Sequence, residues 1–478
     1  ESSLLGLKLT YKYQHIRNFM ASIDQSSDIE VSQEEIEKVS SPETLSIWGL
    51  AWPSILANIL FAAVGIVGLK AVGALGTEAL AAVGTGQRIF FVIQSLIMAV
   101  STGTTALIAR AYGSGNKNEG ALVLFDSLWI GIALGVFTTF VGWIYGESIL
   151  GLFGLNEQSK ELAVDYLKYS MLFSAMFSAS FIFGAALRAA GDAKTPLAIM
   201  IFQNIINVFL LIGLVNGSFG LPNLGVVGAA FAWGISFTIG TLICFFLWLS
   251  NLTIIKRPKF HSFNRNRIKL ILKISTPATI EQGIFQFGLL IYFWIISLYG
   301  TAPVAAYNIG INILMLSFMI GQGFSIAGAT LTGQFLGADN PKEAKRSGWR
   351  STGLSIISMT FIGLIVAIFS KEISGFLIND PEVIRLTIIF VWFLGSMQPL
   401  MAIEFALGGA LRGAGDTKSP LIITMIGLVF FRLSVAFIFL VFNLPIEYIF
   451  SSLMIDYLVK AVLFSYRFNS GKWIKKLV

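Results

Sequence analysis

Cysteine and histidine are nearly absent from this chain of 478 residues. Its single cysteine, Cys244, excludes an internal disulfide framework and a metal site built from cysteines. The two histidines, His15 and His261, lie in polar segments, so a histidine-rich metal site is not expected either. No nucleophile–base pair or metal motif stands out. We therefore expect no metal, no other cofactor and no enzymatic activity.

Charged residues are also scarce, at 12% of the chain against 55% hydrophobic residues. A soluble globular protein carries about twice that share of charge. Apolar runs of about 20 residues recur along most of the chain, and each is long enough to cross a bilayer. Because these runs are too long and too apolar for barrel strands, we expect an all-α integral membrane protein. The twelve predicted spans are 47–69, 87–112, 121–145, 163–187, 195–216, 225–250, 269–298, 307–335, 347–370, 386–411, 419–442 and 446–466.

The second half of the chain repeats the first. Residues 184–197 read GAALRAAGDAKTPL and residues 408–421 read GGALRGAGDTKSPL, with ten of the fourteen positions identical. The offset of 224 residues also relates Pro53 to Pro277. Duplication of a helical unit is typical of transporters and predicts two pseudo-symmetric six-helix lobes. The predicted parts are a disordered segment 1–46, an amino lobe 47–250, a basic inter-lobe loop 251–268, a carboxy lobe 269–466 and a basic tail 467–478.

The basic residues gather on one side of the predicted membrane. Loops on the side of the two termini and the inter-lobe loop hold 25 of the 33 Lys and Arg residues. The positive-inside rule therefore places both termini in the cytoplasm, with the chain in a plasma (inner) membrane. The same loops account for the net charge of +7, so we expect the lipid bilayer rather than nucleic acid as the partner. We expect a monomer.

The repeated motif joins two spans on the cytoplasmic side in each half. In this interpretation an arginine ends one span, a glycine permits the turn, an aspartate caps the next helix and a proline occupies its first turn. We expect a structural hinge with interfacial charges rather than a substrate site. The residues concerned are Arg188, Gly191, Asp192 and Pro196 in the first copy and Arg412, Gly415, Asp416 and Pro420 in the second.

The same motif carries a family resemblance. ALRAAGDAKTP at 186–196 and ALRGAGDTKSP at 410–420 resemble the paired signature of the MATE (multidrug and toxic compound extrusion) transporters, and AVGALGTEALAAVG at 71–84 extends the likeness. The resemblance covers roughly residues 47–470. It implies two facing six-helix lobes that export organic, often cationic or amphipathic, small molecules in exchange for Na⁺ or H⁺.

Two positions depart from the family pattern. Many members carry an Asp in span 1, where this chain has Gly68, and an Asp in span 5, where it has Leu211. Both acids of the amino lobe are therefore missing. A proton or Na⁺ site of the usual kind is not expected in this lobe.

Three ionisable residues lie deep in the predicted carboxy-lobe spans. Glu281, Glu404 and Arg432 are costly to place in hydrocarbon, so each should face a partner or a cavity. We assign them to ion coupling, with a buried Glu–Arg structural pair as the alternative. Asp456 and Lys460 are four residues apart on one helix and should neutralise each other.

Neutral polar residues within the spans are candidates for a substrate cavity, with hydrogen bonding between helices as the alternative. They are Gln203, Asn204 and Asn207 in the amino lobe and Gln282, Gln286, Tyr292, Asn308 and Asn312 in the carboxy lobe.

Three functions are compatible with this sequence. The first is a cation-coupled exporter that works by alternating access. The second is a flippase for lipid-linked precursors, which would need a strongly cationic cavity; Arg432 is nearly the only deep cation here. The third is an uncoupled carrier, which only the missing amino-lobe acids favour.

Overall fold

The computed structural model describes residues 45–258 and 264–474. Most of the amino-terminal segment, the middle of the inter-lobe loop with His261, and the last four residues lie outside these ranges. The described residues from Leu45 onward cluster as one compact unit, and the predicted lobe boundaries stay a prediction. They are almost entirely helical and contain no strand, which confirms the all-α fold class.

Ten helical segments of the described chain are long and apolar enough to span a membrane, and two bent helix pairs bring the number to twelve. The amino half contains α3 (Ile47–Gly73), α4 (Thr77–Met98), α5 (Val100–Gly113), α6 (Lys117–Leu150), the 3-10 turn η1 (Gly151–Phe153), α7 (Glu157–Leu172), α8 (Ser174–Ala189), α9 (Lys194–Asn216) and α10 (Gly225–Leu249). The carboxyl half contains α11 (Arg265–Ser297), α12 (Thr301–Gly337), α13 (Pro341–Ile368), α14 (Ser370–Leu377), α15 (Pro381–Ser396), α16 (Gln398–Gly413), α17 (Lys418–Met425), the π-helix η2 (Ile426–Leu433), α18 (Ser434–Val441) and α19 (Ile446–Asn469).

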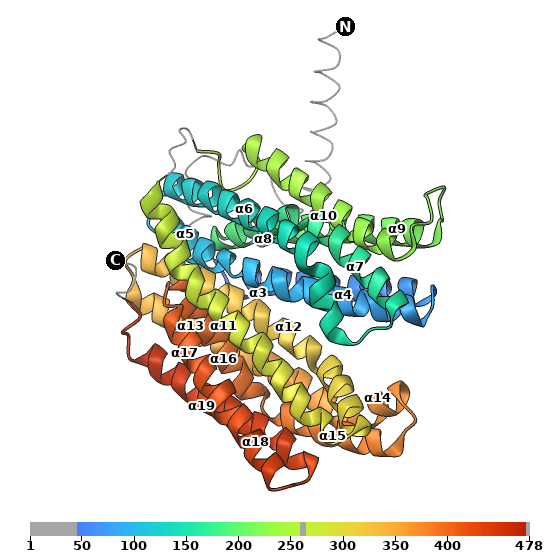
Figure 1. The fold of residues 1–478 in the computed structure, drawn as a ribbon. Helices are drawn as coiled ribbons and strands as arrows, with labels where there is room; N and C mark the ends of the chain where they lie inside the picture. The colour runs from blue at the N-terminus through green and yellow to red at the C-terminus, as the bar shows by residue number, and fades with distance from the viewer. Residues whose placement is uncertain (1–44, 259–263, 475–478) are drawn as a thin grey trace, which may run out of the picture. The chain divides into compact units, whose positions relative to one another are not determined.

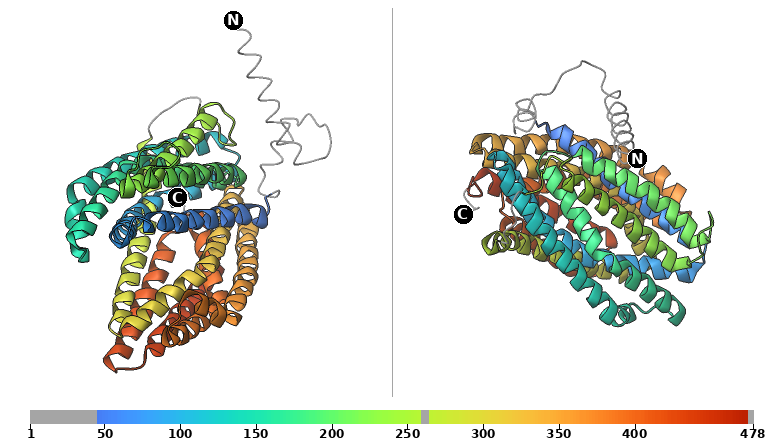
Figure 2. Two further views of the ribbon diagram at one scale, coloured as in Figure 1. Left: turned by 90° about the vertical axis from the view of Figure 1, so that its right-hand side faces the viewer. Right: turned by 90° about the horizontal axis from the view of Figure 1, so that it is seen from above.

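The two halves form separate bundles, blue to green and yellow to red in Figures 1 and 2. The internal repeat is also visible where the helices are irregular. Span 4 bends by 52° between α7 and α8 at Phe173, and span 10 bends by 51° between α15 and α16 at Met397. These two residues are also 224 positions apart. The bend is therefore a property of the duplicated unit, and apolar periodicity gave no sign of it.

The halves meet at the end of the bundle that carries the turns Gly113–Lys117 and Gly337–Pro341 and the start of α11, which we call the basic end. Here α12 packs against α3 and α5, and α11 packs against α5. Glycines allow this approach, because a Cβ at Gly113 would strike the backbone of Gln334 and a Cβ at Gly337 would strike the backbone of Arg110. The two contacts are related by the repeat offset.

Hydrogen bonds cross between the halves at the same end. Ser275 of α11 donates to the carbonyl of Val100 at 3.2 Å. On α12, the Thr330 hydroxyl donates to the Arg188 carbonyl at 3.2 Å and the Gln334 amide to the Ala189 carbonyl at 2.8 Å. The basic end is thus the closed end of the interface in this conformation.

Candidate functional site

A network of four charged side chains lies inside the carboxyl half. Lys460 of α19 places Nζ 3.2 Å from Glu404 of α16 and 3.3 Å from Asp456, one turn earlier on its own helix. Asp456 also pairs with Arg432 of η2. Arg432, Asp456 and Lys460 are almost fully buried, whereas the Glu404 side chain keeps 19% of its surface exposed. The predicted Asp456–Lys460 pair is confirmed, and the four charges cancel.

Local structure sets the position of Arg432. It lies in η2, a π-helical stretch that interrupts span 11, and such stretches concentrate at functional sites. Its guanidinium lies 5.8 Å from the ring centre of Tyr292 and 5.2 Å from that of Tyr457, both within cation–π range. Two aromatic rings and one carboxylate therefore hold this cation in the interior.

A Glu–Arg pair is present, but the partner of Glu281 is Arg412 rather than Arg432. Glu281 accepts hydrogen bonds from Arg412 at 2.5 and 3.3 Å and from the Thr424 hydroxyl at 3.1 Å. Arg432 lies beside Tyr292, which is eleven residues, or about 16 Å, further along α11.

Arg412 therefore does more than end a span. With 28% of its side chain exposed, it links the repeated motif to Glu281. Glu404, Gly408 and Arg412 are spaced by four residues and share one face of α16. By the repeat offset, Ala57 of the amino half corresponds to Glu281 of the carboxyl half. Arg188, the counterpart of Arg412, therefore has no acid at the matching position.

The rest of the motif forms the predicted turns. Gly191 and Gly415 adopt positive φ angles of 103° and 86°. Asp192 accepts from the backbone N–H groups of Lys194 and Thr195, at 3.1 and 3.0 Å. Asp416 accepts from the N–H of Ser419 at 3.3 Å and pairs with Arg467 at 2.6 Å. Pro196 and Pro420 lie in the first turns of α9 and α17, as expected.

The amino half holds a neutral counterpart of the charge network. Asn207 donates to Ser236 at 3.2 Å and Gln203 donates to Ser180 at 3.4 Å. By the repeat offset, Ser180 corresponds to Glu404 and Ser236 to Lys460. Gln203 and Asn207 are buried between α9 and its neighbours, and the amide nitrogen of Asn204 is buried without a partner. These contacts are hydrogen bonds between helices rather than the lining of open space.

The two positions that lack the family's acids face each other. A Cβ built on Gly68 of α3 lies 3.9 Å from a methyl carbon of Leu211 of α9. Leu211 is buried in an apolar cluster with Val72 and Leu214. The surroundings of these two positions in the amino half are therefore apolar.

The cavity candidates of the carboxyl half divide into two groups. Tyr292 is fully buried and donates to the carbonyl of Ile449 at 2.9 Å, so it belongs to the core. Gln282 and Gln286 of α11 are half-buried, and Asn308 and Asn312 of α12 are exposed. Gln282 and Gln286 follow Ser275 by seven and eleven residues, which puts them on the helix face that meets the amino half.

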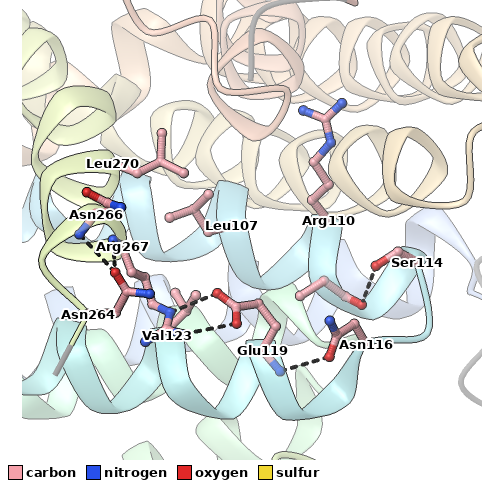
Figure 3. Close-up of a pocket in the computed structure, with 11 residues that line it drawn as sticks. Leu107, Arg110, Ser114, Asn116, Glu119, Val123, Asn264, Asn266, Arg267 and Leu270 are labelled. Carbon is pink, nitrogen blue, oxygen red and sulfur yellow. Dashed lines mark hydrogen bonds and ion pairs between the residues drawn. The ribbon is translucent and has the colours of Figure 1, made fainter. Parts of the chain in front are cut away.

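A pocket of about 400 Å³ lies at the basic end, between α5, α6 and the start of α11 (Figure 3). Arg267 crosses it, bonding to Glu119 at 2.8 Å and to the buried Asp126 at 2.9 Å. Asn116 and Asn264 serve as helix caps on its rim. Arg267, Glu119 and Asp126 pair with one another, which favours a structural junction between α11 and the amino half. Arg110 also lines the pocket, and its Nη1 is buried without a hydrogen-bond partner. Among the described residues there is no group of three or more acidic, histidine or cysteine side chains that could hold a metal.

A duplicated helical bundle that buries a charge network in one half is the architecture of a secondary membrane transporter. The chain belongs to the MATE family: the family model MatE matches residues 53–212 and 277–438. The two matched segments start 224 residues apart, in the register of the internal repeat.

Curated relatives and solved structures agree with this assignment. The chain is 32% identical over 441 residues to a "Probable multidrug resistance protein NorM" of Thermotoga maritima, covering 90% of this chain and 93% of the relative. It is 24% identical over 347 residues to a "FAD transporter" of Shewanella oneidensis, covering 72% and 76%. An outward-facing multidrug resistance MATE transporter structure matches with a TM-score of 0.85 at 20% identity, covering 93% of this chain and 100% of that one. The chain is thus a membrane transporter of the MATE family.

Proposed function

We propose that this protein is a cation-coupled antiporter that exports amphipathic organic compounds by alternating access, with the carboxyl half carrying the coupling ion. The network of Glu404, Lys460, Asp456 and Arg432 is the observation that carries this proposal. A transporter gains from buried ionisable groups that change partner or protonation state, whereas a plain scaffold does not need them. The amino half, with neutral groups at the matching positions, shapes the path of the substrate.

The chemistry of the network favours H⁺ over Na⁺ as the coupling ion. Sodium prefers a shell of oxygen ligands, but Glu404 and Asp456 each have a cationic nitrogen within ion-pair distance. Glu281 likewise has Arg412. A proton neutralises one carboxylate and releases its cation, so its binding changes the contacts between helices. In this proposal Glu281 and Glu404 exchange the proton, and Arg432 stays paired with Asp456.

The alternating step requires the closed basic end to open. Gly113 and Gly337 bring the halves into backbone contact there. Separation of the two contacts would give access from that side, which the positive-inside rule assigns to the cytoplasm of a bacterial cell. Each chain contains both halves of this interface, so a monomer suffices.

The flippase alternative receives no support from the interior charges. A pyrophosphate needs several free cations, yet Arg432 and Lys460 are both paired with carboxylates. All cations of the described network are neutralised in the same way.

Efflux from proteoliposomes with separately imposed gradients tests the proposal. The purified protein should expel an amphipathic dye when a pH gradient is imposed without Na⁺, and a Na⁺ gradient at equal pH should have little effect. Glu404→Gln should weaken the response to the pH gradient. Passive exchange that is equal with and without either gradient would identify an uncoupled carrier, and gradient-independent movement of a lipid-linked precursor would identify a flippase.

A further inference from the structure

Two lysines in the first turns of α11 have no acidic partner. Lys269 and Lys273 are exposed and one turn apart on the same helix. Within the described parts of the chain, no acidic side chain lies within ion-pair distance of either. They follow Arg265, the first residue of α11, by about 6 and 12 Å. Cations at this depth are stable where they meet water or an anion.

The face of α11 that carries these lysines is turned toward lipid. Seven and fourteen residues after Lys273 come Ile280 and Phe287, which are 49% and 68% exposed, and Ile291 follows Phe287 by four. Residues at spacings of four and seven share one face of a helix. Large apolar side chains exposed along one face of a membrane span contact the acyl chains. Lys269 and Lys273 therefore stand where this lipid-facing stripe reaches the headgroups at the basic end.

The pocket at the basic end lies beside the same two lysines. Asn266 and Leu270 line it from α11 (Figure 3). Lys269 and Lys273 each follow one of them by three residues, so the four side chains occupy one side of the helix. The lysines thus border the pocket. Its volume of about 400 Å³ lies within the range of small-molecule sites.

The lining of the pocket changes from polar to apolar with depth. Asn116 and Asn264 cap α6 and α11 through their side-chain oxygens, which leaves their amide N–H groups for another acceptor. Leu107, Val123 and Leu270 form the apolar part of the lining. Val123 is six residues, or about 9 Å, beyond the start of α6. The same change in polarity, from headgroup to acyl chain, is found along a phospholipid.

The charges around the pocket favour an anionic ligand. Glu119 and Asp126 both pair with Arg267. Arg110 has a buried Nη1 without a hydrogen-bond partner, and Asp339 acts on its charge only from beyond ion-pair distance. Together with the two lysines of α11, three cations beside the pocket have no ion-pair partner among the described residues.

We propose that Lys269, Lys273 and Asn266 bind the phosphate of an anionic phospholipid, whose first acyl carbons enter the apolar part of the pocket. A lipid fits better than a soluble phosphate, because the lysines continue a lipid-facing stripe and the pocket is lined with leucine and valine. Basic pockets between membrane helices bind such headgroups on the cytoplasmic side. Residues of α5 and α6 bound the pocket from the amino half and residues of α11 from the carboxyl half. A bound lipid therefore contacts both halves near their closed end, whatever solute the protein moves.

Native mass spectrometry of the purified full-length protein tests the site. The protein receives equal amounts of phosphatidylglycerol and phosphatidylcholine in detergent micelles; both lipids have a phosphate, but only the first has a net negative charge. Each lysine beside an anionic lipid contributes about fivefold to its affinity. We therefore expect the wild type to prefer phosphatidylglycerol by about twentyfold. Lys269→Gln and Lys273→Gln should each retain about fivefold, and the double variant should bind both lipids equally.

Two controls separate this site from a general attraction of charge. The double substitution Lys342→Gln with Lys472→Gln removes the same charge from exposed lysines elsewhere at the basic end and should leave the preference unchanged. Leu270→Asn places an amide in the apolar part of the pocket and should lower the occupancy of both lipids. Thermal unfolding in detergent should be unchanged in the lysine variants, because both side chains are exposed and unpaired.

Four results would overturn the proposal. They are equal binding of the two lipids by the wild type, a full preference in the double variant of α11, an equal loss of preference in the control pair, and unchanged occupancy in Leu270→Asn. Excess inorganic phosphate should not displace the lipid, since it has no acyl chain to fill the pocket. Displacement would identify a soluble phosphate as the ligand and contradict the lipid.

Discussion

At the scale of single residues, the carboxyl half differs from the amino half by a few substitutions at matched positions. Ser180, Ser236 and Ala57 of one half correspond to Glu404, Lys460 and Glu281 of the other. The resulting acids are not free but ion-paired. Protonation of either glutamate therefore has a mechanical consequence, since it releases a neighbouring cation. This is the property that a coupling site requires.

Glu281 and Arg412 give the sharpest test of that property. Glu281→Gln leaves Arg412 without its carboxylate, so we expect lost coupling together with destabilisation of about 1–3 kcal/mol, since one partner of a charged hydrogen bond remains unpaired. Glu404→Gln should impair coupling less and destabilise the protein less, because Lys460 keeps its second carboxylate partner, Asp456. The double substitution Glu281→Gln with Arg412→Gln should recover thermal stability in detergent but not proton-driven efflux. Recovery of efflux in the double variant would show that the pair is purely structural.

The amino half offers a test in the opposite direction. Gly68→Asp places a carboxylate beside the methyl groups of Leu211, which belongs to an apolar cluster. We expect no added coupled ion and a lower thermal unfolding temperature, because a buried carboxylate without a partner is unfavourable by several kcal/mol. Ala substituted at the same position adds the Cβ without the charge and is the matched control. The measurement is the proton-to-substrate stoichiometry of wild type and variant in the same liposomes, and a higher value in Gly68→Asp would contradict this interpretation.

Sequence reasoning at the residue scale succeeded where contacts are local. The Asp456–Lys460 pair and the turns around Asp192 and Asp416 follow from spacings of two to four residues. It failed for Glu281, whose partner Arg412 is 131 positions away.

At the scale of helices, apolar runs predicted all twelve spans but not their breaks. The bends at Phe173 and Met397 and the π-helix η2 carry no periodicity signal, because the flanking residues stay apolar. Pro399 follows the second bend directly, but the first has no proline beside it. The two halves therefore share the helix bend, although only the second half has a proline beside it, and proline is a frequent cause of such bends.

The helix contacts at the basic end predict how the conformational balance can be shifted. Gly337→Ala adds a Cβ that meets the Arg110 backbone, which should cost about 1–3 kcal/mol in the closed arrangement only. We expect the ratio of molecules with an open basic end to molecules with a closed one to rise about tenfold or more. Gly353→Ala is the matched control, because nothing lies within 4 Å of a Cβ there.

Spin labels at exposed positions of the two halves measure this opening. Cysteines at Asn118 of α6 and Lys342 of α13, with Cys244→Ser, place one label on each half near the basic end. The distance distribution should move to longer values in Gly337→Ala and stay unchanged in Gly353→Ala. An unchanged distribution in both variants would show that the glycine contact does not control the closure.

At the scale of the whole molecule, the basic end differs from the opposite end in two independent ways. It is the end where the halves touch, and it is the end that carries most of the cationic loops. If the positive-inside rule holds for this chain, the closed end faces the cytoplasm and the observed conformation faces outward. The two features have different physical origins, helix packing and membrane insertion, so their coincidence is informative only if the orientation is measured.

Labelling with a membrane-impermeant thiol reagent measures it. Asn266 is exposed at the start of α11, at the basic end, and Gln158 is exposed in the first turn of α7, at the other end. In a Cys244→Ser background, we expect Gln158→Cys to react in intact cells and Asn266→Cys to react only after the membrane is opened. The expectation follows from 25 of the 33 basic residues lying on the Asn266 side, where translocation across the membrane would be opposed. The reverse pattern would invert the topology and make the observed conformation inward-facing.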